Sequence, residues 1–351
     1  MATKSFATAI NEALALAMEI DDGVLCYGLG VDDPKGVFGT TLGLQRRFGK
    51  QRVFDMPTSE NAMTGIGIGA ALYGMKPVMT HQRLDFALLS MDQLVNNAAK
   101  WRFMFGGKRG VPLTVRMILG RGWGQGPTHS QNLQAWFAHV PGLKVVMPST
   151  AEDAKGLLLS AIFDPDPVIF LEHRWLHNLR GDVPDGDVRV PLGVANRLRH
   201  GSDITVVAVS YMTIEALHAV SHLAAHGVSC DLIDLRSVRP IDWTTILASV
   251  RRTGRLLVLD SGNLTGSISG EIVARVATDC WDALRAAPQR LAMPDYPEAT
   301  APSMTEGYHV RAEHIVERIG SMLGKPVESA TLREQRKHPH DVPGDWFSGP
   351  F

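Results

Sequence analysis

The hydrophobic positions in the first half of the chain alternate between two kinds of run. Between residues 6 and 18 they recur at helical spacing, and the next apolar run, 24–28, is short and continuous. Continuous apolar runs separated by helical stretches are typical of parallel strands that are covered on both faces of a sheet. The same pattern predicts further strands at 52–54, 77–80, 113–119, 143–147 and 168–171, and helices at 60–73, 84–104 and 151–163.

A second alternating unit follows a change of composition. Residues 179–200 are rich in Gly, Asp, Pro and Arg and are expected to form a linker. Strands are then predicted at 203–208, 229–235 and 255–259, with helices at 213–225 and 243–250. A chain of 351 residues is long enough for two such cores. We therefore expect an α/β protein with a parallel-sheet domain at 1–178, a linker at 179–200, a smaller α/β domain at 201–325 and an extended tail at 326–351.

Composition and charge exclude several classes of protein. Lys plus Arg (35) nearly balance Asp plus Glu (36), so no overall field favours binding to nucleic acid or to an acidic membrane. No apolar run is long enough to span a bilayer, and the first residues lack the apolar core of a secretory signal. The three cysteines are far apart and form neither a zinc motif nor a disulfide framework, which fits a reducing compartment. A cytoplasmic location is expected.

The first candidate for chemistry is Glu60, which opens a glycine-rich stretch after a predicted strand. It would lie in the first turn of a helix at the carboxyl end of a strand, where open α/β sheets build their sites. A carboxylate in that turn is also favoured by the helix macrodipole, by about 0.3–1 kcal/mol. From the residues alone, a structural role and a site role are both open.

The second candidate is His129, in the run of residues 120–131. The glycines of this run make a loop that can approach a ligand closely, and His129 precedes a predicted helix at 131–137. An imidazole there can change charge near neutrality and handle a proton or a substrate carboxylate. The alternative is a histidine at a helix start that is satisfied by the backbone.

These segments are similar to a known family. Residues 52–60, the helix at 91–100 and the His129-Ser130-Gln131 element resemble the beta subunit of the thiamine diphosphate-dependent 2-oxo acid dehydrogenases, the decarboxylating component, in the transketolase-like superfamily. The resemblance extends over nearly the whole chain. It implies a pyrimidine-binding domain followed by a transketolase C-terminal-like domain, which mainly builds the dimer interface.

The resemblance also implies roles for single residues. Glu60 would be hydrogen-bonded to the N1′ nitrogen of the cofactor's aminopyrimidine and act as a general acid/base through it. Phe86 stands where the family places an aromatic ring against the pyrimidine, although a core phenylalanine would look the same. His129 would face the reacting centre. Glu60 and His129 are thus the expected catalytic residues, and Glu60 and Phe86 the expected cofactor-binding residues.

Three features depart from the dehydrogenase pattern. His81 and Arg83 stand where the family usually has apolar or small residues, and residues 28–31 lack the family's acidic residues. His81 and Arg83 could recognise an anionic or hydroxylated substrate, or form a buried polar pair at an interface. The element Gly126-Pro127-Thr128-His129 also resembles transketolases. A split transketolase-like two-carbon transferase is therefore an alternative function, and a non-catalytic scaffold subunit is another.

Two places are candidates for metal binding. Ala161, Asp164 and Asp166 match the loop where many such beta subunits hold a structural K⁺, mainly by backbone carbonyls, although Asp-Pro-Asp-Pro is also an ordinary turn. His338 and His340 in the tail could give one weak anchor for a metal, with a solvated tail as the alternative.

The chain lacks a part that thiamine diphosphate enzymes need. No strand ends in the Gly-Asp-Gly element that, with a later Asn, holds Mg²⁺ and the diphosphate in this family. The resemblance therefore implies half an active site, completed by an alpha subunit in an α₂β₂ assembly, with lipoyl groups of an acyltransferase as the usual acceptor. Other enzyme motifs are not found: residues 266–270 have Ile268 where a nucleophile elbow needs Ser, and there is no P-loop.

Overall fold

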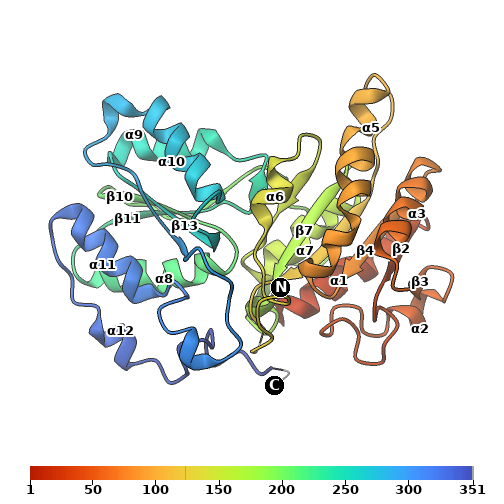
Figure 1. The fold of residues 1–351 in the computed structure, drawn as a ribbon, viewed down its shortest axis with the longest axis horizontal. Helices are drawn as coiled ribbons and strands as arrows, with labels where there is room; N and C mark the ends of the chain where they lie inside the picture. Colours follow the sequence, from red (N-terminus) through yellow and green to blue (C-terminus); the bar gives the residue numbers. More distant parts are fainter. Residues whose placement is uncertain (123, 350–351) are drawn as a thin grey trace. The chain divides into compact units, whose positions relative to one another are not determined.

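The computed structural model describes residues 1–122 and 124–349, which form two compact units. The first unit consists of Met1–Arg121 and Thr128–Leu192, and the second contains residues 122–127 and the chain from Gly193 onward. Trp123 of the glycine-rich run and the last two residues of the expected tail lie outside the described residues. Each unit is an α/β layer structure (Figure 1).

The first unit is built on a parallel sheet, as the continuous apolar runs predict. Its strands lie in the order β6-β7-β5-β4-β2-β3, and each neighbouring pair is parallel. Because all strands run the same way, their carboxyl ends meet at one edge. The bounds are β2 (Val24–Gly28), β3 (Val53–Asp55), β4 (Lys76–His81), β5 (Thr114–Leu119), β6 (Lys144–Val146) and β7 (Val168–His173).

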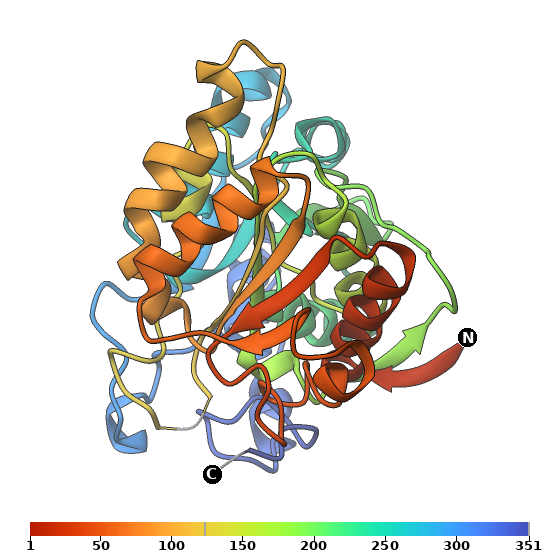
Figure 2. The ribbon, with the colours of Figure 1, turned by 90° about the vertical axis from the view of Figure 1, so that its right-hand side faces the viewer.

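Helices cover both faces of this sheet (Figure 2). On one face α1 (Phe6–Ile20) packs against α7 (Ala151–Ile162), and their first turns are capped by the hydroxyls of Ser5 and Thr150. On the other face lie α3 (Glu60–Leu72) and α5 (Ala99–Met104). The shorter helices of the unit are α2 (Leu44–Phe48), α4 (Leu84–Ala87) and α6 (Gln134–His139).

The helix predicted at 84–104 is one helical stretch of changing geometry. It begins with α4, tightens into a 3₁₀ turn at Leu88–Ser90, widens into a π-helix at Gln93–Ala98 and ends as α5. A π-bulge of this kind inserts residues without ending a helix, so apolar periodicity alone does not reveal it.

The centre of the sheet contains a buried ion pair. Arg116 on β5 donates two hydrogen bonds to the carboxylate of Glu172 on β7, at 2.7 and 3.0 Å, and both side chains are fully buried. A third donation, at 3.3 Å, reaches the hydroxyl of Thr80 on β4. Burial alone would raise the pKa of Glu172, but Arg116 and His177 outweigh burial and hold that pKa below its usual value. The pair therefore stabilises the fold above about pH 4.3, and this contribution is lost as the pH falls.

Two short segments of the expected linker form strands. β8 (Arg180–Val183) pairs antiparallel with β1 (Ala2–Ser5), a strand that the sequence did not predict. β9 (Asn196–Arg199) is the antiparallel edge strand of the second sheet. Both segments are short and polar, so they carry no hydrophobic period from which a strand could be predicted.

The second unit contains a smaller sheet in the order β14-β13-β10-β11-β9, parallel except for β9. Its core gathers apolar side chains of β10, β11, α8 and α11. The remaining bounds are β10 (Ile204–Ala208), α8 (Tyr211–Ala225), β11 (Cys230–Asp234), β12 (Ser237–Arg239), α9 (Trp243–Thr253), β13 (Leu256–Asn263), α10 (Ile268–Asp279), β14 (Gln289–Met293) and α11 (Ala312–Leu323).

The segment after α11, expected to be an extended tail, packs onto the second unit. It contains the short helix α12 (Ala330–Glu334), and Phe347 is buried. Arg311, at the start of α11, donates hydrogen bonds to the carbonyls of Val342 and Pro343 at 3.2 and 3.3 Å. Val327 and Leu332 also pack against the core of this unit, so apolar contacts and backbone hydrogen bonds together hold the segment.

Two general expectations can be compared with the structure. No helix among the described residues is long and apolar enough to cross a membrane. The three cysteines are free and buried, and burial raises the pKa of the Cys26 thiol to about 11.

We predict that replacing Arg116 alone destabilises the fold much more than replacing both Arg116 and Glu172. Arg116→Met should lower the free energy of unfolding by about 3–5 kcal/mol, because an uncompensated carboxylate stays buried, whereas Arg116→Met with Glu172→Leu should recover most of the loss. Urea unfolding followed by circular dichroism measures both. Arg275→Met, which removes an exposed i,i+4 pair with Asp279, is the control and should cost less than about 0.5 kcal/mol. Equal losses for Arg116→Met and Arg275→Met would contradict the prediction.

Candidate functional site

Glu60 is the first residue of α3, at the edge where the strands of the first unit end. Its side chain is only 4% exposed, and no other described residue donates a hydrogen bond or forms an ion pair with its carboxylate. Four residues later the hydroxyl of Thr64 donates to the carbonyl of Glu60 at 2.7 Å, which holds the first turn in place. A carboxylate at a sheet edge that the rest of the described chain does not engage is available to a ligand, which is common at functional sites.

An apolar cluster lies beside the first turns of α3. It consists of Tyr27, Met56 and Met79, with Leu29, Phe54 and Met63 packed against it. The Tyr27 hydroxyl donates to the carbonyl of Met63 at 3.0 Å. A Cβ at Gly67 would lie 2.2 Å from that hydroxyl, so only glycine lets α3 approach the sheet this closely. The glycine-rich sequence of α3 thus lets the helix that begins at Glu60 pack closely against the sheet.

Phe86 and His129, which the sequence placed in one site, are in contact. Their ring centroids are 5.2 Å apart and the rings are nearly perpendicular, at 89°. Phe86 lies on α4, directly after β4, and His129 lies in the loop that follows β5. The Thr128 hydroxyl is 3.0 Å from His129 Nδ1. Both side chains are half-buried, so a ligand can reach them.

A second contact joins the same two segments and was not predicted from the sequence. The amide of Gln131 donates to the Asp85 carboxylate at 2.7 Å, across 46 residues of sequence. Burial raises the pKa of Asp85, and the hydrogen bond from Gln131 opposes this rise. Both residues are neighbours of predicted site residues, but nothing in their local pattern reveals the pairing.

His81 and Arg83, considered as a polar pair, lie in different surroundings and do not bond each other. Arg83 donates to the carbonyl of Gly120 at 2.9 Å, and its guanidinium lies 5.9 Å from the Phe38 ring. The Arg174 guanidinium lies 4.5 Å from the same ring, and burial together with Arg83 lowers the pKa of Arg174 to about 10. His81 is 1% exposed, and burial lowers the pKa of its imidazole to about 4.

The glycine at position 30 is explained by the close approach of the Gln82 side chain, which follows β4, to the backbone after β2. A Cβ at Gly30 would lie 2.4 Å from the amide nitrogen of Gln82. The Gly30 backbone N–H donates to Asp55 at 2.7 Å. Gln82, which the sequence did not single out, therefore lies at the same edge as Glu60.

The two carboxylates of the expected potassium loop form ion pairs with a lysine and an arginine of the same unit. Lys144 reaches the two carboxylate oxygens of Asp164 at 2.7 and 2.6 Å, and Arg102 reaches Asp166 at 2.5 Å. The Ala161 carbonyl accepts from the Asp164 N–H at 3.3 Å. An ion at this loop would have to be held by backbone carbonyls, and the potassium site stays a prediction.

The histidines of the C-terminal segment do not converge on a metal. His338 lies 2.8 Å from Asp345, whereas His340 lies 3.0 Å from the Thr305 hydroxyl. Over residues 1–122 and 124–349, no group of three or more His, Cys, Asp or Glu side chains is placed to hold a metal ion.

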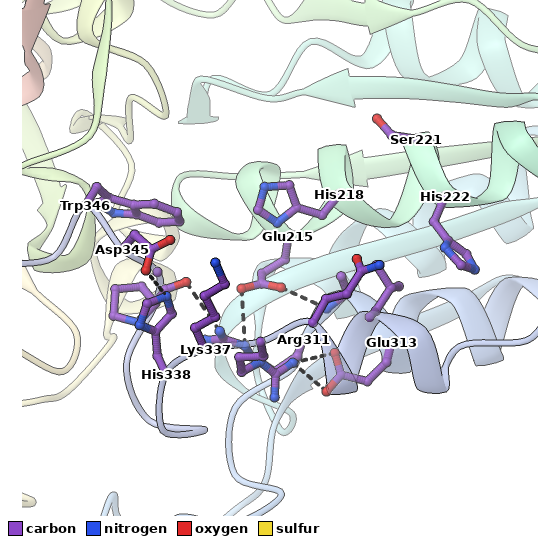
Figure 3. Close-up of a pocket in the computed structure, with 16 residues that line it drawn as sticks. Glu215, His218, Ser221, His222, Arg311, Glu313, Lys337, His338, Asp345 and Trp346 are labelled. Carbon is purple, nitrogen blue, oxygen red and sulfur yellow. Dashed lines mark hydrogen bonds and ion pairs between the residues drawn. The ribbon is translucent and has the colours of Figure 1, made fainter.

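A cavity of about 600 Å³ lies in the second unit; of the residues singled out from the sequence, only His338 of the expected tail lines it, and Glu60, Phe86, His129, His81 and Arg83 do not. Figure 3 shows its charged side chains mostly paired with one another: Arg311 with Glu215, and His338 with Asp345. Arg336 likewise pairs with Glu313 at 2.6 Å. This mutual neutralisation indicates a surface that fixes the C-terminal segment, and we keep the carboxyl edge of the first unit as the candidate site.

Comparison with known proteins gives two family matches that cover most of the chain. The family described as "Transketolase, pyrimidine binding domain" matches residues 2–178, and "Transketolase, C-terminal domain" matches residues 193–315. The second match ends within α11, so the segment after α11, which is hydrogen-bonded to Arg311, lies beyond the matched residues.

Three curated relatives match over 71–97% of their own length. The acetoin:2,6-dichlorophenolindophenol oxidoreductase subunit beta of Cupriavidus necator is 41% identical over 321 residues, which cover 89% of this chain and 95% of the relative. The 2-oxoisovalerate dehydrogenase subunit beta of Bacillus subtilis is 40% identical over 317 residues, covering 90% and 97%. The pyruvate dehydrogenase E1 component subunit beta of Rhizobium meliloti is 39% identical over 326 residues, covering 93% and 71%.

A solved structure shares the fold. It is described as a split gene transketolase, an inactive beta4 tetramer, and it matches with a TM-score of 0.74 over 92% of this chain and 99% of that chain. At 20% sequence identity this likeness shows the fold alone.

We predict that the bond between Gln131 and Asp85 holds the His129 segment in place. Gln131→Leu should speed amide hydrogen exchange in residues 128–133 by roughly tenfold, because it removes a hydrogen bond to a charged group. Exchange followed by mass spectrometry gives the rates. Gln51→Leu, at an exposed position of the same unit, is the control. Unchanged exchange in Gln131→Leu would show that the segment is held by other contacts.

Proposed function

The chain belongs to the family of beta subunits of thiamine diphosphate-dependent 2-oxo acid dehydrogenases, with a transketolase pyrimidine-binding and a C-terminal domain, and we propose that it supplies the pyrimidine half of a shared active site. The observation that carries the proposal is the carboxylate of Glu60, a buried residue at the first position of α3 that no other described residue engages. The contact of Phe86 with His129 at the same edge supports it.

The residues at this edge fit the flat heterocycle of the cofactor. A carboxylate without a protein partner can accept a hydrogen bond from a ring nitrogen, and the apolar cluster with Phe86 offers a surface for an aromatic ring. Thiamine diphosphate, when bound, supplies an electron sink for cleaving a carbon–carbon bond next to a carbonyl group.

Each residue then has a defined task. Glu60 would hold the proton at the pyrimidine ring nitrogen and exchange it as a general acid/base. Phe86 would orient the ring and keep water from that face. His129, whose Nδ1 is taken by the Thr128 hydroxyl, would accept or donate a proton to the substrate through Nε2.

The reaction we propose is decarboxylation of a 2-oxo acid with transfer of the acyl or hydroxyalkyl unit to an acceptor such as lipoamide. The relatives have different substrates according to their names, which specify pyruvate, 2-oxoisovalerate or acetoin. Their names therefore do not fix the substrate of this chain, and His81 and Arg83 are our candidates for the residues that select it.

The proposal includes a partner and metals. An alpha subunit would supply the ligands of Mg²⁺ and the diphosphate in an α₂β₂ assembly, and a lipoyl acyltransferase would take the product. A structural K⁺ at the loop of Ala161, Asp164 and Asp166 would be bound through carbonyl oxygens, since the carboxylates are engaged by Lys144 and Arg102. We propose a cytoplasmic location, which fits the three unlinked cysteines.

A split transketolase-like two-carbon transferase is the second candidate, favoured by the Gly126-Pro127-Thr128-His129 element. The assembled complex should then convert ketose phosphates rather than 2-oxo acids, and product analysis with both substrates separates the two. A non-catalytic scaffold subunit is the third candidate, and the retention of Glu60, Phe86 and His129 argues against it.

We predict that Glu60→Gln abolishes activity without unfolding the chain. Loss of a general acid/base group should lower kcat of the assembled complex by roughly 100-fold or more. Dye reduction with a 2-oxo acid measures this. Glu152→Gln is a matched control, because Glu152 also lies in the first turn of a helix but is exposed. Both variants lose the same small stabilisation of a first-turn carboxylate by the helix macrodipole, so a difference in activity between them reports on catalysis. A complex that stays active with Glu60→Gln would refute the catalytic assignment.

We also predict the composition of the assembly. Native mass spectrometry of the tagged chain, purified from its own host, should show a heterotetramer that contains thiamine diphosphate and a second chain with a Gly-Asp-Gly element. A homodimer without cofactor would instead support the scaffold function.

A further inference from the structure

The run that carries His129 is divided between the two units of the chain. Gly122–Pro127 belongs to the second unit, whereas Arg121 before it and Thr128 after it belong to the first. His129 therefore lies two residues beyond a segment that packs with the second unit. The family resemblance assigns the second unit mainly to a dimer interface, and this division points to a further role.

Gly126 is the residue at which the second unit holds this segment. It is buried and has a φ of +78°, a backbone conformation that residues with a Cβ rarely adopt. A Cβ at Gly126 would lie 2.3 Å from the hydroxyl oxygen of Thr300 and 3.6 Å from the Thr300 Cβ. Glycine is therefore required here twice, for the backbone conformation and for the close approach of the Thr300 hydroxyl.

Thr300 lies on a segment that the second unit fixes at several points. The Asp295 carboxylate accepts hydrogen bonds from the backbone N–H and the hydroxyl of Thr265, at 2.9 and 2.7 Å. The Glu298 carboxylate lies 3.3 Å from the His309 imidazole, and both side chains are buried. These contacts make the segment a fixed support for the glycine that it touches, although the Thr300 side chain is itself exposed.

A short and stiff piece of chain joins this support to His129. Pro127 has a fixed φ, so the backbone direction that is set at Gly126 continues through it. The hydroxyl of the next residue, Thr128, lies 3.0 Å from His129 Nδ1. The place and the orientation of the imidazole therefore depend on where Gly126 is held.

The first unit supports the other side of His129. The amide of Gln131 donates to the Asp85 carboxylate at 2.7 Å, and the carbonyl of Gln131 accepts from the Gly120 backbone N–H at 3.4 Å. The run between these supports has glycines at 120, 122, 124 and 126, and glycine has the largest backbone freedom of all residues. Two supports are therefore needed to give His129 one position.

We propose that Thr300 is a positioning residue: by resting against Gly126 it sets where the His129 imidazole stands. The inference rests on the proposed function, in which His129 exchanges a proton with the substrate. Such a group must lie within hydrogen-bond distance of the atom it serves, and a displacement of about 1 Å can lower a rate roughly 100-fold. The second unit thus acts on catalysis as well as on assembly.

The test removes the contact from each side and then restores it, in the chain assembled with its alpha partner. The probe is whichever of pyruvate and 2-oxoisovalerate the unchanged complex oxidises faster, followed by reduction of 2,6-dichlorophenolindophenol. Gly126→Ala introduces a clash and should lower kcat by roughly 10- to 100-fold, with KM within about threefold. Thr300→Ala removes the support and should lower kcat by roughly 3- to 10-fold, whereas Thr300→Ser keeps the contacting oxygen and should retain at least about half of kcat.

The double variant is the sharpest part of the test. In Gly126→Ala with Thr300→Ala, the new methyl group takes the place of the lost hydroxyl, and the nearest remaining atom of residue 300 is its Cβ at 3.6 Å. Because the two changes compensate each other, kcat of the double variant should exceed that of Gly126→Ala alone by at least about threefold.

Two controls separate positioning from general effects of the substitutions. Gly307→Ala adds a Cβ at a φ of +72° with no atom within 4 Å, so it repeats the backbone strain without the clash. Thr278→Ala removes a threonine hydroxyl from an exposed position of α10. Both should leave kcat within about threefold of the unchanged complex.

Amide hydrogen exchange of the full chain adds a readout that needs no activity. Thr300→Ala should speed exchange in residues 124–131 by roughly tenfold, because one support of the run is lost. Exchange in residues 295–299 should stay unchanged, since their hydrogen bonds and ion pair do not involve the Thr300 side chain.

Several outcomes would overturn the inference. These are an unchanged kcat in both single variants, a double variant no better than Gly126→Ala alone, unchanged exchange in Thr300→Ala, and an assembly that dissociates in Thr300→Ala. If Glu60→Gln abolishes an activity that the Thr300 and Gly126 variants leave unchanged, the proposed function stands and only the inference about Thr300 fails. If the unchanged complex oxidises neither 2-oxo acid, the proposed function fails, and the role of Thr300 in that reaction fails with it.

Discussion

The candidate site depends on a fully buried ion pair in the middle of the first sheet. Arg116 and Glu172 fix β5 against β7, and the contact of Arg116 with Thr80 adds β4. These strands deliver His81 and the loop of His129 to the carboxyl edge of the sheet. Because a slip of one residue would move every side chain to the other face, a fixed register is the condition for the site. A charged pair that must face its partner specifies register more sharply than apolar residues, which can exchange neighbours.

The sequence predicted the first unit well, for a physical reason. Strands that are buried on both faces must be apolar throughout, so their positions are visible in the sequence, and the structure confirms the parallel sheet. The elements that were missed obey weaker constraints. β1 and β8 are held by backbone pairing at an edge, and the segment after α11 is held partly by the hydrogen bonds of Arg311 to two carbonyls and partly by single apolar residues such as Val327 and Leu332. Because every residue has a backbone carbonyl, hydrogen bonds to carbonyls cannot be predicted from the residue types of a segment.

The site was predictable as far as its residues follow strand ends. Glu60 and Phe86 each follow a strand within five residues, His129 lies in the loop after β5, and the structure brings Phe86 and His129 into contact. The pair of Asp85 and Gln131 and the position of Gln82 beside Gly30 depend on distances between segments, which local patterns do not contain. The separation of His81 from Arg83 has the same origin. The strand ends at His81, so the alternation that would have put both side chains on one face ends there too.

The glycines of α3 have a consequence for the order of folding. Glycine lowers helix stability by roughly 1 kcal/mol per residue relative to alanine, and α3 contains Gly65, Gly67 and Gly69 within 13 residues. A helix of this composition is not stable alone and forms only when the sheet is there to pack against. The nascent chain must therefore complete β4 before the turn with Glu60 becomes ordered. The turn that carries the residue proposed to activate the cofactor is thus stabilised by the folded sheet rather than by its own helix.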